Sequence, residues 1–181
     1  FLALAHLEMG NFLLKQNDIQ RAYSAYQNVL DQDGRNFLAN YNLGCILPLR
    51  GDSQQSPDYF ETVVREYEDY FPAQVNMLLA QLSVDRVMDA DNQLDDLLSK
   101  YPDNPYLFLA RALERFAAAD TRAALEYLDR SQEAANDRAV SFVIRGEIQL
   151  RLFQFEKALA SFEEALLRDK KNIRALLGKA H

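Results

Sequence analysis

The chain has 181 residues, of which 49% are hydrophobic and 26% charged, so it is long enough to bury a core and too apolar for a disordered chain. Its 27 acidic and 20 basic residues give a net charge of −7, which argues against nucleic-acid binding through a generally basic surface. Only 6 glycines and 5 prolines are present, few for an all-β protein, and no run of about 18 apolar residues predicts a membrane-spanning helix.

The sequence aligns with itself, without gaps, at a spacing of 34 residues. The repeats are 3–36, 37–70, 71–104, 105–138 and 139–172, and residues 173–181 begin a sixth. We number the places within each repeat from 1 to 34. Place 20 is small and is held by Ala22, Ser56, Ala90, Ala124 and Ala158. Place 24 is large and is held by Tyr26, Phe60, Leu94, Leu128 and Phe162. Place 8 is mostly small and is held by Gly10, Gly44, Leu78, Ala112 and Gly146. Three columns that recur together indicate a repeat protein.

Each repeat predicts two helices. The first covers about places 1 to 14, and a break follows near residues 16, 51, 85, 119 and 154. The second runs to about place 31, where turn sequences such as DGRN at 33–36 and PDNP at 102–105 end it. The small residue at place 8 is expected to face the small residue at place 20, with the ring of place 24 beside them. The sequence therefore predicts ten helices and a partial eleventh, in antiparallel pairs, with no strand.

The second repeat departs most from this pattern. Pro48 falls late in a first helix, where its ring predicts a tightened or kinked last turn. Ser56 and Pro57 read as an N-cap serine followed by proline at the first helical position. The second helix of this repeat is expected to begin about three residues late.

The repeat resembles the tetratricopeptide repeat, whose signature has a period of 34 residues. The resemblance is carried by HLEMGNFLLKQNDIQRAYSAYQNVLDQDGRN at 6–36, by NLGCILPLRGD at 42–52 and by LLSKYPDN at 97–104. It implies an all-α fold, a right-handed α-solenoid of antiparallel helix pairs, with residues 1–181 forming a single array. Since the chain begins at Phe1 without Met, we expect it to be a piece of a longer protein.

Three arginines depart from the family pattern. Arg111, Arg115 and Arg145 stand where the family usually has apolar residues. Two alternatives are open: repeats four and five are locally reoriented, or the arginine stems snorkel to solvent.

The third repeat contains a group of aspartates, namely Asp85, Asp89, Asp91, Asp95 and Asp96. This group is interpreted either as a solvated outer face or as a docking site for a basic partner.

Catalytic and metal-binding signatures are lacking. The two histidines, His6 and His181, are far apart in sequence, and the single cysteine, Cys45, has no histidine near it. These residues argue against histidine-based catalysis, a nucleophilic cysteine and a multi-histidine metal site. The sequence thus predicts a protein that is not an enzyme and has no cofactor.

The resemblance implies that first helices line a concave groove. The residues expected to contact a partner there are Asn11, Tyr41, Asn42, Asn76, Leu79, Tyr106, Leu109, Leu113 and Phe116. This lining is apolar with a few amides, which suits an extended peptide or an amphipathic helix. The carboxylate clamp of heat-shock co-chaperones is not matched, because its cationic places hold Leu7, Pro72 and Asn76.

We therefore expect a binding module that recruits a protein or peptide partner, without nucleic acid and without insertion into a membrane. The alternative is a structural or oligomerising scaffold in a bacterial envelope, secretion or polysaccharide assembly. Exposed array ends also leave homo-oligomerisation open. The sequence does not decide between a cytoplasmic and a periplasmic location.

Overall fold

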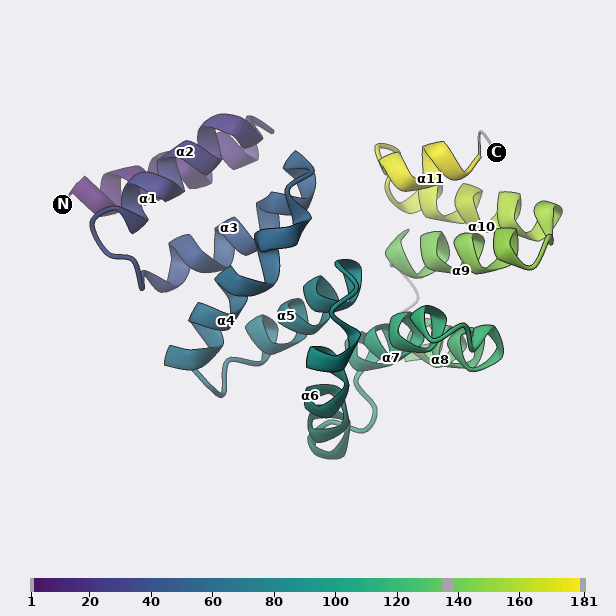
Figure 1. Cartoon of the computed structure of the whole chain (residues 1–181). Coiled ribbons are helices and arrows are strands. Elements are labelled where there is room, and N and C mark those ends of the chain that lie inside the picture. Colours follow the sequence, from purple (N-terminus) through teal and green to yellow (C-terminus); the bar gives the residue numbers. More distant parts are fainter. Residues whose placement is uncertain (1, 135–138, 180–181) are drawn as a thin grey trace. The chain divides into compact units, whose positions relative to one another are not determined.

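The computed structural model describes residues 2–134 and 139–179 (Figure 1). Within these ranges it contains α-helices and one short 3-10 helix, and no strand. The helices of the first half are α1 (Leu2–Lys15), α2 (Ile19–Leu30), α3 (Phe37–Arg50), the 3-10 helix η1 (Ser53–Gln55), α4 (Ser56–Glu66) and α5 (Phe71–Ser83). Those of the second half are α6 (Val87–Lys100), α7 (Pro105–Ala117), α8 (Thr121–Ala134), α9 (Ala139–Arg151), α10 (Phe155–Arg168) and α11 (Ile173–Gly178). The predicted ten helices and partial eleventh are confirmed.

The contacts divide the chain into two compact units, 1–86 and 87–181, which we call unit 1 and unit 2. In unit 1, α1 pairs with α2 and α3 pairs with α4, and each pair contacts the next helix along the chain. In unit 2, α7 pairs with α8 and α9 pairs with α10, while α11 packs on α10 and α9 (Figure 1). Antiparallel pairing of successive helices, predicted from the repeat, is confirmed in each unit.

The turn inside each repeat has the same backbone conformation. Positive φ values, from 56° to 87°, occur at place 15 of all five repeats, namely at Asn17, Gly51, Asp85, Ala119 and Phe153. The next residue in each case donates its N–H to the carbonyl five residues back, as Asp18 does to Leu13 at 2.9 Å. This is a Schellman ending, which satisfies the last carbonyls of the first helix and reverses the chain. The five predicted breaks are confirmed, and their cause is a left-handed residue at a fixed place.

The recurring columns form the core. Every residue of places 20 and 24 is buried, and the place-24 ring lies directly over the glycine of place 8. A Cβ added to Gly10 would lie 2.5 Å from the Tyr26 ring, and one added to Gly146 would lie 2.6 Å from the Phe162 ring. Place 8 is thus small because a ring occupies the space where its side chain would be, a closer contact than the sequence analysis expected.

The second repeat carries a pair of compensating changes. Pro48 lies inside α3 and has no N–H to donate to the carbonyl of Gly44, four residues back. Ser56 Oγ donates to that carbonyl at 2.6 Å, and Ser56 is buried. The late start of α4 is confirmed, since η1 precedes it. The N-cap role expected of Ser56 is wrong: α4 begins at Ser56, and its hydroxyl serves the carbonyl that Pro48 leaves without a partner.

In unit 2, a basic residue at place 7 pairs with an acidic residue at place 25 of the preceding repeat. The pairs are Arg111 with Asp95, Arg145 with Asp129 at 2.6 Å, and Lys179 with Glu163 at 3.0 Å. Arg111 also contacts Asp91 at 3.1 Å and Glu114 at 3.3 Å. Snorkelling to solvent is therefore wrong for Arg111, which is 4% exposed, and for the largely buried side chain of Arg145. Asp91 and Asp95 form ion pairs with Arg111 inside unit 2. Neither of the two interpretations of the aspartate group predicted this role.

Candidate functional site

The amides expected in the groove of unit 1 bond to one another and to tyrosines. Tyr26 donates its hydroxyl to Asn11 Oδ1 at 2.8 Å, and Asn42 Nδ2 donates to the same oxygen at 3.2 Å. Burial raises the pKa of Tyr26, while its hydrogen bond to Asn42 acts in the opposite direction. These three residues link α1, α2 and α3.

A similar link joins α3 to α5. Asn76 Nδ2 donates to the Tyr41 hydroxyl at 2.9 Å and lies 3.9 Å from Cys45 Sγ. Asn42 and Asn76 are only half-buried, and the Oδ1 atom of each accepts no hydrogen bond from the residues described in unit 1. The amides therefore fix the spacing of adjacent first helices through their nitrogens and keep an acceptor at the surface.

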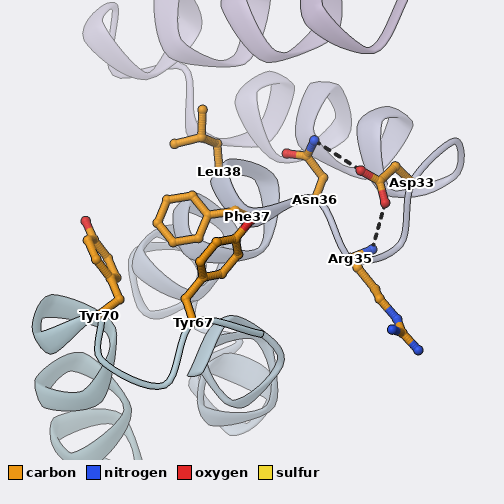
Figure 2. A pocket seen from close by; sticks show the side chains of 7 residues that line it. All are labelled: Asp33, Arg35, Asn36, Phe37, Leu38, Tyr67 and Tyr70. Atoms are coloured by element: carbon orange, nitrogen blue, oxygen red, sulfur yellow. Dashed lines mark hydrogen bonds between the residues drawn. The ribbon is translucent and has the colours of Figure 1, made fainter. Parts of the chain in front are cut away.

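A hollow of about 420 Å³ opens where α3 begins (Figure 2). Its lining is Asp33, Arg35, Asn36, Phe37, Leu38, Tyr67 and Tyr70. The Phe37 ring meets the rings of Tyr67 and Tyr70 in T-shaped contacts, with centroid distances of 4.9 and 5.0 Å. Tyr70 in turn contacts the Tyr41 ring at 5.8 Å, so the hollow is continuous with the expected groove residue on α3.

Phe37, Tyr67 and Tyr70 are not among the residues that the sequence predicted to contact a partner. Tyr67 and Tyr70 lie between the helices of successive repeats rather than on a first helix. The available signal was the stretch YEDYF at 67–71, three aromatic residues within five positions of an otherwise polar turn. Aromatic side chains exposed in a turn are more typical of recognition than of a helical repeat core.

The predicted residues of unit 2 differ in accessibility. Tyr106 is exposed, and Leu113 and Phe116 are half-buried. Leu109 is 1% exposed, so it packs in the core of unit 2 and cannot serve as an anchor in this state. The guanidinium of Arg151 lies 4.1 Å from the centroid of the Phe116 ring and covers one of its faces.

The single cysteine lies beside the amides on α3. Cys45 is exposed, yet the protein on most sides of its thiol limits hydration and raises its pKa to about 11. A thiol with that pKa is a poor nucleophile at neutral pH.

Among residues 2–134 and 139–179, no cluster of three or more His, Cys, Asp or Glu side chains could hold a metal ion. Over the same residues, no helix is both long and apolar enough to cross a membrane.

Comparison with known proteins gives the family. A tetratricopeptide-repeat family model matches residues 139–172, the bounds of the fifth repeat. A tetratricopeptide-repeat protein from Parabacteroides merdae superposes with a TM-score of 0.79 over 97% of this chain and 68% of that one, at 15% identity. The chain is a tetratricopeptide-repeat protein. Both the predicted family and the all-α fold of paired helices are confirmed.

Other relatives of this tetratricopeptide-repeat protein show the same fold. TTC0263 of Thermus thermophilus has a TM-score of 0.75 and 18% identity, over 98% of this chain and 97% of that one. DnaJ homolog subfamily C member 3 of Rattus norvegicus is 23% identical over an alignment of 175 positions that covers 88% of this chain. The chain spans only 35% of the length of that relative. Tetratricopeptide repeats generally mediate protein–protein interactions and are typically non-catalytic.

Proposed function

We propose that this chain is a non-enzymatic interaction module in which the first helices of unit 1 bind a partner peptide or helix through apolar contacts. One observation carries the proposal. Three leucines on α1 and α3 remain exposed although the unit has a complete core: Leu4 at 60%, Leu38 at 45% and Leu49 at 67%. Exposed large apolar side chains gathered on neighbouring elements are typical of interaction surfaces.

The amides give this surface a polar element. A partner backbone N–H can bond to the Oδ1 atoms of Asn42 and Asn76, whose nitrogens are already used within the unit. Tyr41 and Leu79 lie on the same two helices and are half-buried. In this arrangement apolar contacts supply most of the affinity, and the amides set the direction of the bound chain.

The remaining predicted contacts are proposed separately for unit 2. Tyr106, Leu113 and Phe116 are accessible enough to contact a partner, whereas Leu109 is not. That the two units form one array remains a prediction. YrrB, which matches 99% of this chain with a TM-score of 0.60 and 18% identity, is described as having an unusual peptide-binding site. A peptide ligand for the present chain would agree with the peptide-binding site described for YrrB.

The experiment isolates a partner by pull-down with the whole chain and then measures its affinity for variants. We expect Leu38→Ser and Leu49→Ser each to weaken binding by about 1–3 kcal/mol while helicity is unchanged, because both side chains are exposed before binding. Leu167→Ser is the matched control, since Leu167 is 72% exposed on the second helix α10. Affinity should change little with salt, because the proposed contacts are mainly apolar.

Two results would contradict this proposal. The first is normal binding by both leucine variants together with loss of binding in the Leu167→Ser control. The second is a steep fall in affinity with rising salt, which would indicate recognition led by charge.

The alternative function is a scaffold that oligomerises through an end of the chain. Leu176 and Leu177 on α11 are 50% and 59% exposed, which favours contact with another surface at that end. Sedimentation distinguishes the two functions. A concentration-dependent dimer that Leu177→Ser abolishes supports the scaffold, and a monomer at all concentrations excludes it.

A further inference from the structure

The hollow at the start of α3 presents aromatic rings to solvent. The planes of Tyr67 and Tyr70 are inclined to that of Phe37 by 72° and 76°, so the rings form an angular wall rather than a flat stack (Figure 2). Tyr67 and Tyr70 are both exposed. The face of an aromatic ring carries partial negative charge and attracts cations.

The turns around the hollow are strongly acidic. Residues 31–36 and 66–70 include five carboxylates and one guanidinium: Asp31, Asp33, Glu66, Glu68, Asp69 and Arg35. Arg35 donates to Glu66 at 3.0 Å, and Figure 2 shows its guanidinium directed away from the three rings. The basic side chain on the rim therefore does not fill the hollow, and the surrounding charge favours a cation.

The beginning of α3 does not reverse this preference. A helix N-terminus carries partial positive charge and would by itself favour an anion. Here Asn36 Oδ1 accepts from the N–H of Ala39 at 3.1 Å, and Asp33 Oδ1 accepts from the N–H of Arg35 at 3.2 Å. The chain's own carboxylate already lies beside the helix end, so an external anion would meet a like charge.

Elsewhere in the described chain, four aromatic rings have an arginine close above them. The distances from guanidinium to ring centroid are 3.7 Å for Arg50 over Tyr23, 4.0 Å for Arg130 over Phe108, 4.1 Å for Arg151 over Phe116 and 4.1 Å for Arg168 over Phe142. Over the part of the chain that the structure describes, no arginine or lysine lies above Phe37, Tyr67 or Tyr70. These three rings therefore have acidic surroundings that favour a cation, and none of the described arginine or lysine side chains of the chain itself occupies that position.

We propose that this hollow receives a basic side chain, arginine or lysine, of a partner peptide. The inference rests on the proposed function, because it assumes that a peptide binds to unit 1. It adds a specificity pocket at one edge of the apolar surface. The aromatic rings stack on the cation, and the acidic turns select against neutral and acidic side chains.

The test uses blocked tripeptides, which are too short to span the helices and so examine the hollow alone. Acetyl-Gly-Arg-Gly-amide is compared with the citrulline peptide, which has nearly the same shape and no charge, and with the glutamate and leucine peptides. Binding to the whole chain is followed by NMR of the Phe37, Tyr67 and Tyr70 ring signals. We expect the arginine peptide to shift these signals at millimolar concentration and the other three to shift them at least severalfold less.

Variants locate the site. Tyr67→Leu and Tyr70→Leu should each weaken binding of the arginine peptide about two- to fivefold. Tyr101→Leu is the matched control, because Tyr101 occupies place 31 of the third repeat as Tyr67 does in the second, and it does not line the hollow. Asp33→Asn should also weaken binding.

Equal shifts with the arginine and citrulline peptides, stronger binding of the leucine peptide, or no shift with any peptide would each overturn the cation pocket. None of these results bears on Leu49, which, unlike Leu38, does not line the hollow and whose variant is tested with the partner itself. A failed cation pocket with intact leucine dependence therefore leaves the proposed function standing. If the hollow binds the arginine peptide but partner binding does not depend on the leucines, the proposed apolar surface is contradicted and the cation pocket still stands.

Discussion

Arg111 illustrates how a charged residue is accommodated at a core place. Burial lowers its pKa, but the nearby carboxylates, Asp95 foremost, more than offset this, so the pKa is raised and the guanidinium stays charged. Glu114, 6% exposed, contacts both Arg111 and Arg115. Because Arg111 and Glu114 are both buried, each depends on the other for compensation of its charge.

We predict that Arg111→Met lowers the free energy of unfolding by about 2–4 kcal/mol, since it leaves the buried Glu114 with a single partner. Urea denaturation followed by circular dichroism measures this. The control is Arg122→Met, which removes an exposed pair with Glu126 and should change stability by no more than about 0.5 kcal/mol. Equal effects of the two substitutions would show that burial of Arg111 is energetically unimportant.

A second prediction concerns the reactivity of Cys45. Its pKa is raised to about 11, so at pH 8 its alkylation by iodoacetamide should be on the order of ten- to a hundredfold slower than in urea-unfolded chain. Because the folded pKa lies above the unfolded one, the thiol's contribution to stability is complete below the unfolded pKa. It is lost as the pH rises through about 11. Cys45 is the single cysteine, so mass spectrometry gives a clean rate. Equal rates in native and unfolded chain would contradict the raised pKa, because Cys45 is exposed.

At the scale of helices, the second repeat shows how a proline is tolerated. α3 continues to Arg50 past Pro48, because the carbonyl of Gly44 finds another donor in Ser56 from α4. The bond ties the two helices of the pair together at the small place 20. A buried carbonyl without any donor would cost about 1–3 kcal/mol, which is enough to account for the serine at a place otherwise held by alanine.

We therefore predict that Ser56→Ala destabilises the chain by about 1–3 kcal/mol in the natural background. With Pro48→Ala already present, residue 48 regains an N–H for the Gly44 carbonyl, and Ser56→Ala should cost less than about 0.5 kcal/mol. The four stabilities of this double-mutant cycle are measured by urea denaturation. An equal cost of Ser56→Ala in both backgrounds would mean that the serine does not replace the lost helical bond.

At the scale of the whole molecule, stability is built from local contacts along the chain. Phe162 is an example, since its ring lies against Gly146 of α9 and against Gly178 of α11. Within unit 2, this ring thus joins the fifth repeat to the beginning of the sixth. In linear arrays of repeats, damage to one repeat affects its neighbours most.

The corresponding prediction uses two glycines. Gly146→Ala forces the Phe162 ring to move and should destabilise the chain by about 1–3 kcal/mol. Amide hydrogen exchange should accelerate most in α9, α10 and α11 and least in α1 and α2. Gly34→Ala is the control, because the nearest atom to its added Cβ is 3.8 Å away. Uniform acceleration throughout the chain with Gly146→Ala would instead indicate a single cooperative unit.

The sequence by itself determined the helices, their turns and the buried columns. These features are local: a helix face depends on spacing of three and four residues, and each reversal at place 15 depends on the residues just before it. The repeat then predicted that Tyr26, Phe60 and Phe162 would be buried beside small residues, because five copies show the same column. It also selected Asn11, Tyr41 and Asn42 for the surface of the first helices.

Tertiary structure alone decided how those surface residues are used. Asn11 and Asn42 lie 31 residues apart, and only the packing of the helices brings the Asn42 amide and the Tyr26 hydroxyl to the same Asn11 oxygen. The same holds for the rings of the hollow, since Phe37 and Tyr67 come from opposite ends of one repeat. Contacts between residues so far apart depend on helix positions and on each side-chain rotamer, neither of which the repeat pattern specifies. The periodic pattern fixes which residues face inward, and packing fixes which of them meet.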